Sequence, residues 1–334
     1  MSWRTRRKRA LLVVAVFAVL GGSTAGCASD RGPVDLAPAA GAATPMPQGA
    51  KVGATDSSAS VDGGNCGDPT ASLSPGALPA PGRMPAGTTM AKIQERGYLI
   101  AGVDQNTFLF GYRNPNTGNL EGFDIDMAHQ VADAIFGDPA KVRFKVINSA
   151  QRVSSLQHGD VDIVARTMTV NCERKQDVSF SAVYYLAGQQ VLVAGDSTAK
   201  SLDDLGGKRV CAALGSTSLD HIAANAAKPV PVAVDDWSDC LVLLQQNQVD
   251  AVSTDDTILA GMAAQDPNVH IVGDRFTKEP YGLAMPKQDA DFVRFVNGVL
   301  EKIRGNHQWQ ASYDRWLRPR LDSGTGQPKP TYSG

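Results

Sequence analysis

Apolar residues recur in two rhythms between about residue 88 and residue 318. Short runs rich in Val, Ile and Leu, bounded by polar turns, predict buried strands. Stretches with apolar side chains three and four positions apart predict helices that cover those strands. The first set of elements comprises strands at 98–103, 142–147 and 161–165 and helices at 125–136 and 151–157.

A second set of elements repeats the pattern. We expect strands at 192–193, 210–214, 230–234, 249–254, 271–272 and 282–285, and helices at 219–227, 236–246, 257–264, 290–304 and 307–317. This alternation predicts an α/β fold in which helices cover parallel sheets. The chain of 334 residues is long enough for two compact domains with extensions.

The N-terminus has the pattern of an export signal. Five basic residues precede an apolar run from residue 10 to residue 20, which is too short to span a membrane. Small residues then lead to Cys27, in a stretch that resembles a bacterial lipobox. We expect a signal peptide at 1–26 and a lipid on Cys27 that anchors the protein outside the cell membrane. The alternative is an ordinary signal peptide followed by an unrelated cysteine.

Composition separates the folded body from its flanks. Residues 28–87 are rich in Ala, Gly, Pro, Ser and Asp, and such a segment buries too little surface to offset its ordering entropy. We therefore expect a lipidated flexible tether at 27–87 and a disordered tail at 321–334. Residues 1–26 hold five of the 32 basic residues and none of the 34 acidic ones, so the mature chain carries 27 − 34 = −7 charges. This charge argues against nucleic-acid binding.

Polar clusters directly follow several predicted strands. They are Asp104, the stretch 167–174, Ser216-Thr217 and Asp255. Ligands of open α/β sheets bind at the carboxyl ends of the strands. Within 167–174, hydroxyl groups and free backbone N–H groups at a predicted helix start stand beside Arg174, which suits a carboxylate. The alternative for this arginine alone is a place on a solvated helix face.

Several short motifs occur in an order that resembles one family. They are Gly122-Phe123-Asp124-Ile125-Asp126, Gly159-Asp160-Val161-Asp162, Glu173-Arg174, Gly215-Ser216-Thr217, Val249-Asp250-Ala251 and Tyr281-Gly282. Together they resemble extracellular solute-binding proteins of family 3, the polar amino-acid branch that serves ABC importers. The resemblance covers about residues 88–318. Within the family, the likeness is to glutamine- and glutamate-binding lipoproteins of actinobacteria.

The resemblance implies a fold and the roles of several residues. The fold is the two-lobed type II periplasmic-binding-protein fold (a Venus flytrap) with a two-crossover hinge, lobe 1 being 88–186 with 280–320 and lobe 2 being 187–279. The ligand would be a polar amino acid (glutamate, glutamine, aspartate or asparagine), whose two charged groups both need partners when enclosed. The implied ligand-binding residues are Asp104, Phe108, Phe110, Arg152, Thr167, Thr169, Arg174, Ser216, Thr217 and Asp255.

In that scheme each end of the ligand has its own partners. Arg174, Thr169 and the loop at Ser216-Thr217 would hold the α-carboxylate, and Asp255 would pair with the α-ammonium. Arg152 would read the side chain, since a guanidinium offers only donors. Asp104 would accept from an amide ligand or orient Arg152. Phe108 and Phe110 would wall the pocket, with core aromatics as the alternative for both.

Partners and rival functions follow from the same residues. A tethered clamp would deliver its ligand to ABC permease subunits or, alternatively, signal amino-acid availability to a membrane sensor, and we expect a monomer. An enzyme is less favoured because H-E-x-x-H, G-x-S-x-G and C-x-x-C motifs are absent from the sequence. We expect no cofactor and no metal, because the five histidines are dispersed.

The four cysteines after Cys27 admit three disulfide pairings. A bridge between lobes would restrain closure, so pairs that stay on one side of the hinge are favoured. In the implied fold, Cys211 and Cys240 both lie in lobe 2, and Cys172 lies in lobe 1. We therefore expect Cys66–Cys172 and Cys211–Cys240, with a free Cys66 as the alternative.

Overall fold

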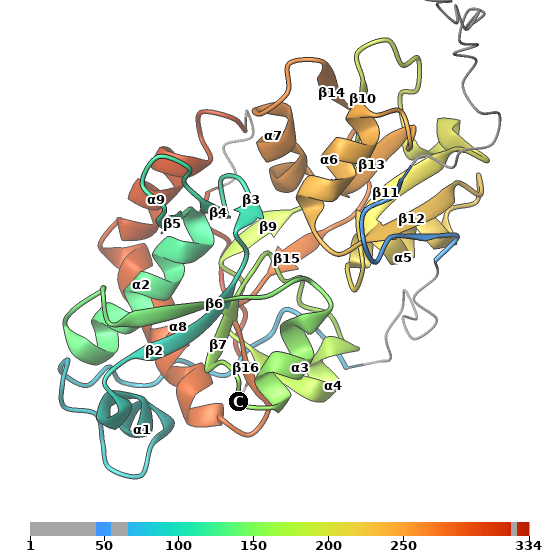
Figure 1. Cartoon of the computed structure of the whole chain (residues 1–334). Coiled ribbons are helices and arrows are strands. Elements are labelled where there is room, and N and C mark those ends of the chain that lie inside the picture. Colours follow the sequence, from blue (N-terminus) through green and yellow to red (C-terminus); the bar gives the residue numbers. More distant parts are fainter. Residues whose placement is uncertain (1–44, 55–65, 322–325, 334) are drawn as a thin grey trace, which may run out of the picture. The chain divides into compact units, whose positions relative to one another are not determined.

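The computed structural model describes residues 45–54, 66–321 and 326–333 (Figure 1). The signal peptide expected at 1–26 and the lipid expected at Cys27 lie outside the described residues. In the described part of the chain, no helix is both long enough and apolar enough to cross a membrane.

Lobe 1 is built on a five-stranded sheet. The strand order is β6 (Val142–Val146), β2 (Leu99–Val103), β7 (Ile163–Ala165), β16 (Ala284–Pro286) and β8 (Val178–Phe180). Its helices are α1 (Thr89–Arg96), α2 (Phe123–Phe136), α3 (Gln151–Gln157), α4 (Arg174–Asp177), α8 (Ala290–Gly305) and α9 (Gln308–Trp316). Helix α2 packs on the sheet and against α8 and α9, while α3 packs on the sheet and against α4 (Figure 1).

Lobe 2 is built on a six-stranded sheet. The strand order is β1 (Lys51–Val52), β12 (Val230–Val234), β11 (Arg209–Ala213), β13 (Ala251–Asp255), β10 (Gln189–Ala194) and β14 (Val269–Val272). The 3₁₀ helix η1 (Leu202–Leu205) and helices α5 (Thr217–Ala224), α6 (Trp237–Gln245) and α7 (Asp256–Ala263) complete the lobe. A separate hydrophobic core lies between this sheet and its helices.

Two short strands carry the chain between the sheets. β9 (Tyr185–Ala187) and β15 (Glu279–Tyr281) pair antiparallel, with Tyr185 opposite Tyr281. β9 leads into β10 and β15 leads into β16, without a covering helix in either case. The prediction of parallel sheets therefore holds only for β6-β2-β7 and β12-β11-β13, while β10 and β16 run antiparallel to their neighbours.

A three-stranded hairpin sheet adjoins lobe 1. It consists of β3 (Asn106–Thr107), β4 (Gly111–Arg113) and β5 (Leu120–Glu121), in that order. Helix α6 of lobe 2 contacts β3, so this sheet is one of the places where the two lobes meet.

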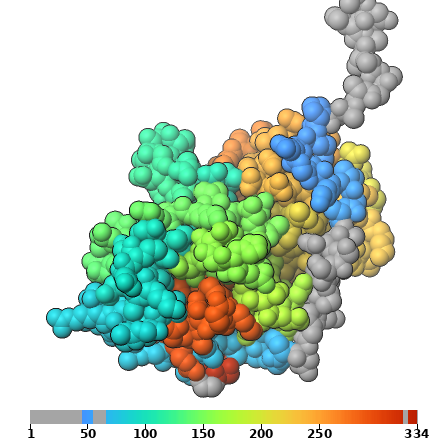
Figure 2. Space-filling view, turned by 60° about the horizontal axis from the view of Figure 1, so that its bottom comes forward, coloured from blue at the N-terminus to red at the C-terminus, as the bar shows by residue number. Residues whose placement is uncertain are grey.

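The segment expected as a flexible tether differs from that expectation wherever it is described. Lys51–Val52 forms the edge strand β1 on β12, and this stretch lies against lobe 2 in Figure 2. Ser72 donates to the backbone oxygen of Phe180 at 2.7 Å and accepts from Asn297 of α8 at 2.8 Å. Hydrogen bonds hold these residues in place. The composition indicates only how much apolar surface the segment can bury, so it did not predict this order.

The expected disordered tail also differs where it is described. The backbone N–H of Ser333 donates to the oxygen of Ser72 at 2.8 Å, and the Tyr332 hydroxyl donates to Glu301 at 2.5 Å. Two segments from opposite ends of the chain therefore pack together on lobe 1.

Two disulfides join the pairs expected from the sequence. Cys66–Cys172 links the N-terminal segment to the loop between β7 and α4. Cys211–Cys240 links β11 to α6 within lobe 2. Neither bridge connects one lobe to the other.

Candidate functional site

A small cavity lies where the two lobes meet, next to the carboxyl ends of β7, β11 and β13. Its lining from lobe 1 comprises Ser149, Arg152, Thr167, Thr169 and Arg174. Its lining from lobe 2 comprises Ser216, Thr217, Ser218, Trp237, Asp255 and Ile258. Seven of the ten residues expected at a ligand site therefore line one cavity, and Asp104, Phe108 and Phe110 do not.

The loop after β7 is held in a strained turn by a buried carboxylate. Thr167 has φ = 40°, in the left-handed region that non-glycine residues rarely adopt. Its backbone N–H donates to Oδ2 of Asp124 at 2.9 Å, and the Tyr184 hydroxyl donates to Oδ1 of the same carboxylate at 2.5 Å. Burial raises the pKa of Asp124 to about 7, although both hydrogen bonds act to lower it. Asp124 thus fixes the loop that presents Thr167 and Thr169 to the cavity.

Arg174 begins the short helix α4 and reaches across to lobe 2. Its backbone N–H donates to Oδ1 of Asn171 at 2.9 Å, which caps the turn. Its guanidinium donates to the oxygen of Thr169 at 2.8 Å and to that of Gly215 at 3.2 Å. Burial lowers the pKa of Arg174, because the charged form loses water.

Arg152, on α3, is buried with backbone oxygens as its partners. It donates to Ser149 at 2.9 Å, to Arg166 at 3.2 Å, to Thr167 at 3.3 Å and to Gly215 of lobe 2 at 2.9 Å. Burial, together with the neighbouring guanidinium groups of Arg174 and Arg166, holds its pKa well below the usual value. Within the described ranges, neither Arg152 nor Arg174 forms an ion pair. Both guanidinium groups are therefore available to pair with an anion.

Asp255 supplies the opposite sign on the lobe 2 side. It ends β13, and the Tyr281 hydroxyl from β15 donates to its Oδ2 at 2.5 Å. Its Oδ1 is buried and has no hydrogen-bond partner. Burial, and after it the nearby Glu279, raises the pKa of Asp255 well above the usual value. An unpaired buried acceptor is costly, and a ligand cation would satisfy it.

Glu279 is a site residue that the sequence analysis missed. Oε2 of this hinge carboxylate accepts from Thr169 of lobe 1 at 2.7 Å and from Thr217 of lobe 2 at 2.9 Å. Oε1 lies 3.7 Å from Nδ1 of His221. The two threonine hydroxyl groups expected to serve a ligand carboxylate thus both donate to Glu279. The signal available in the sequence was an acidic residue two positions before the Tyr281-Gly282 motif.

One of the two roles expected for Asp104, the pairing with Arg152, is not found. It forms a buried ion pair with Arg166 at 2.8 Å and accepts from Thr107 at 2.6 Å and from the N–H groups of Gln105 and Asn106. The expectation that Asp104 pairs with Arg152 is wrong, because Arg166 lies between them in the network. Asp104 therefore stabilises the loop after β2.

The two phenylalanines have different surroundings. Phe110 is fully buried and packs edge-on against Phe123, Tyr185 and Tyr281, so it is a core aromatic and not a pocket wall. Phe108 lines a second small cavity, which shares Trp237 and Ile258 with the central one. Phe108 therefore lies next to the candidate site and does not line it.

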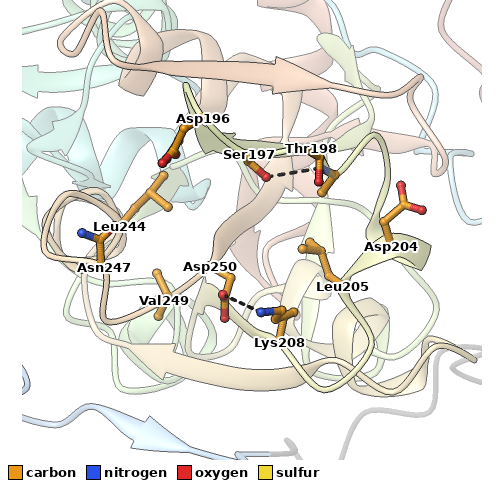
Figure 3. A pocket seen from close by; sticks show the side chains of 12 residues that line it. Asp196, Ser197, Thr198, Asp204, Leu205, Lys208, Leu244, Asn247, Val249 and Asp250 are labelled. Carbon is orange, nitrogen blue, oxygen red and sulfur yellow. Dashed lines mark hydrogen bonds and ion pairs between the residues drawn. The ribbon is translucent and has the colours of Figure 1, made fainter.

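A further, more open cavity lies elsewhere. It is lined by residues such as Asp196, Lys208 and Asp250 (Figure 3). These residues stand at the ends of β10, β11 and β13 opposite to Asp255. Its one ion pair, Lys208–Asp250 at 3.6 Å, is exposed. No group of three or more His, Cys, Asp or Glu residues in the described part of the chain could hold a metal ion.

The geometry defines the chemistry that the central cavity can accept. Two guanidinium groups without an acidic partner, Arg152 and Arg174, face one carboxylate oxygen of Asp255 without a donor. A small molecule with both an anionic and a cationic group would satisfy all three. A free amino acid has these two groups on one carbon atom.

Known proteins are similar to this chain in both sequence and fold. The chain is 39% identical over 231 residues to the "ABC transporter glutamine-binding protein GlnH" of Bacillus subtilis, covering 69% of this chain and 85% of the relative. It is 31% identical over 258 residues to the "Glutamate-binding protein GluB" of Corynebacterium efficiens, covering 73% of this chain and 85% of the relative. The solved structure of an ancestral arginine-binding protein bound to glutamine aligns with a TM-score of 0.61 at 36% identity, covering 66% of this chain and 98% of that one.

The family assignment rests on most of the folded region. Residues 99–319 match one family, from the first strand of the lobe 1 sheet to the end of the last helix. Its solved relatives have the two-lobed periplasmic-binding-protein fold described above. The chain belongs to the bacterial extracellular solute-binding proteins, family 3.

Proposed function

We propose that the protein binds a polar amino acid (glutamate, glutamine, aspartate or asparagine) between its two lobes and delivers it to an ABC permease. The observation that carries the proposal is the unpaired Oδ1 of Asp255 in a cavity that also holds Arg152 and Arg174. The α-ammonium group of the ligand would bind Oδ1 of Asp255, and its α-carboxylate would bind Arg174. The proposal assigns binding and release to this site and no chemical reaction.

Each residue has a role in this proposal. Arg174 grips the α-carboxylate, exchanging its contact with the Gly215 oxygen for the ligand. The backbone N–H groups at the start of α5, next to Ser216 and Thr217, provide further hydrogen-bond donors to the α-carboxylate from lobe 2. Arg152 donates to the side-chain oxygen. Because an enclosed guanidinium repels another cation, ligands such as arginine or lysine are disfavoured.

The relatives support the same ligand class. Those at 39% and 31% identity are named for glutamine and glutamate, and the similar solved structure, an ancestral arginine-binding protein, is bound to glutamine. The donors that Arg152 offers suit both side chains, because an amide and a carboxylate each present an oxygen. We therefore expect the acidic amino acids and their amides to bind within about 1–3 kcal/mol of one another, the scale of a hydrogen bond to a charged group.

Titration calorimetry with Glu, Gln, Asp, Asn, Arg and Leu tests the proposal. Binding of the first four, and at least tenfold weaker binding of Arg and Leu, is the expected result. Preferred binding of Arg or Leu would remove the side-chain role of Arg152 and, with it, the substrate class.

The location of the protein follows in part from its family. Family 3 is extracellular, so the protein works outside the cytoplasm. We further propose that a lipid on Cys27 holds it at the cell membrane, because a basic and apolar leader precedes that cysteine. Detergent-phase partitioning of the wild type and Cys27→Ala tests this: the wild type should enter the detergent phase and the variant should not. Equal retention of both in the aqueous phase would contradict lipidation.

A further inference from the structure

The indole N–H of Trp237 is buried beside the central cavity and has no part in the ligand contacts proposed for the other residues. Trp237 is the first residue of α6, is 3% exposed and lines the central cavity. Its Nε1–H is buried and has no hydrogen-bond partner. Buried indole N–H groups normally find an acceptor, and leaving one unpaired is costly.

The other two described tryptophans, both on α9, each have an acceptor for this group. Trp309 donates its Nε1–H to the backbone oxygen of Tyr184 at 2.9 Å, and Trp316 donates to Oδ2 of Asp126 at 2.9 Å. Among the described tryptophans, only Trp237 lacks an acceptor, and only Trp237 lines the cavity. The missing acceptor therefore coincides with the place where a ligand would sit.

The position of Trp237 indicates which part of the ligand it faces. Trp237 and Ile258 form the wall that the central cavity shares with the cavity of Phe108. Arg174, Thr217, Arg152 and Ser149 line the side shared with a more open cavity, in which Trp237 takes no part. Arg174, the main partner of the α-carboxylate, and the indole are therefore on different sides. The ligand group nearest Trp237 is the side chain.

We propose that Trp237 is a specificity-determining residue that donates its indole N–H to the side-chain oxygen of the bound amino acid. This inference rests on the proposed function. Arg152 of lobe 1, a cation, and Trp237 of lobe 2, a neutral donor, would then reach the same side chain from opposite sides of the cavity. An indole is a donor only, so it selects ligands whose side chain ends in an acceptor. A neutral donor can hydrogen-bond to an amide oxygen as well as to a carboxylate oxygen, which fits a site that binds amino acids with either side chain.

Closure of the lobes would complete this contact. Helix α6 contacts β3 of lobe 1, so Trp237 stands at the junction between the lobes. Contacts to the ligand side chain from both lobes would make closure depend on the identity of the ligand. A side chain without an acceptor would leave the buried indole N–H unpaired in the closed state.

Nuclear magnetic resonance of the indole N–H groups tests the contact directly. The Trp237 resonance is assigned by its loss in Trp237→Phe. Saturating glutamine should move it downfield, while the Trp309 and Trp316 resonances stay in place as internal controls. Norleucine, which carries no side-chain oxygen, should leave the Trp237 resonance in place. An unmoved resonance with glutamine overturns the proposal, and an equal shift with norleucine does so too, because the acceptor would then be the α-carboxylate.

Affinity measurements on an isostere complete the test. Replacing Trp237 by β-(3-benzothienyl)alanine exchanges the N–H for sulfur and keeps the ring. Glutamine and glutamate should bind about five- to fifty-fold more weakly, as expected when one buried hydrogen bond is lost, with the melting temperature of the free protein unchanged. Trp316→Phe is the matched control and should leave both affinities unchanged. A change below twofold in the isostere overturns the proposal, whereas a wild type that binds none of the four amino acids overturns the proposed function itself.

Discussion

The Tyr281 hydroxyl donates to Oδ2 of Asp255 at 2.5 Å, so a strand that crosses between the lobes holds one oxygen of the site's buried carboxylate. The other oxygen has no partner. Tyr281 also meets the Thr257 hydroxyl at 3.1 Å, which fixes the phenol on the lobe 2 side. The carboxylate is therefore oriented before any ligand arrives, with one acceptor left for a cation.

Asp255 makes ligand affinity depend on pH. Burial raises its pKa in the empty protein, and a bound ammonium group would lower it, so binding requires loss of any proton on Asp255. Affinity should be constant above the raised pKa and fall as the pH drops below it, by up to about tenfold per pH unit. Calorimetry in two buffers of different ionisation enthalpy should show proton release in that range. Asp255→Asn should bind weakly with no such release, and release that persists in Asp255→Asn would assign it to another group.

Arg174 and Asp255 should each be required for stabilisation by the ligand. Ligand at 100 times its dissociation constant should stabilise the wild type by about 2.7 kcal/mol. Arg174→Ala and Asp255→Ala should each lose the resulting rise in melting temperature. Lys208→Ala, in the distant cavity of Figure 3, is the control and should keep it. A rise that survives in either site variant would remove that residue from the site.

Asp124 should make the free protein less stable as the pH rises. Its pKa is about 7 when folded, against an ordinary value of 3.8, so its contribution is fully present below that ordinary value and is lost as the pH rises through about 7. At 1.36 kcal/mol per pKa unit, the loss is at most about 4 kcal/mol. Asp124→Asn keeps an acceptor for Thr167 and a partner for Tyr184 but does not titrate. Denaturant unfolding at several pH values should therefore show a flatter profile for the variant, and parallel profiles would contradict the assignment.

Much of the fold could be predicted because its central strands are continuous apolar runs. The strand expected at 230–234 is β12 as observed, and the one expected at 98–103 is β2 to within one residue. β9 and β15 were missed because three residues are too few to show a period. β9 and β15 pair with each other across a long separation in the sequence, and no local sequence pattern indicates this pairing.

The site could be predicted where a polar residue follows a strand. Arg174, Ser216 and Asp255 were found in this way, because parallel strands end at one edge of a sheet. Glu279 was missed because its partners Thr169 and Thr217 are 110 and 62 residues away. Phe110 was misplaced because a phenylalanine beside a polar turn has the same local pattern in a core as in a pocket wall.

The two disulfides should differ in how much they stabilise the protein. Cys66–Cys172 closes a loop with a sequence separation of 106 residues, against 29 for Cys211–Cys240. In the chain-entropy account a longer loop gives a larger effect, within about 2–5 kcal/mol for each bridge. Cys66→Ser with Cys172→Ser should therefore lower unfolding free energy more than the pair Cys211→Ser with Cys240→Ser. Limited proteolysis should also cut residues 66–87 faster in the first variant, and unchanged cleavage would mean that hydrogen bonds alone hold the segment.

Glu279 should set the pH at which ligand affinity declines. Its charge is the second cause, after burial, of the raised pKa of Asp255. Glu279→Gln removes that charge but keeps an oxygen to accept from Thr169 and Thr217, so the variant should lose affinity at lower pH than the wild type. Glu279→Ala removes the acceptor as well, and the two buried threonine hydroxyl groups would lose their shared partner at the junction of the lobes. The alanine variant should therefore bind more weakly at every pH, through a faster dissociation rate. A decline at the same pH in Glu279→Gln and the wild type would show that burial alone raises the pKa of Asp255.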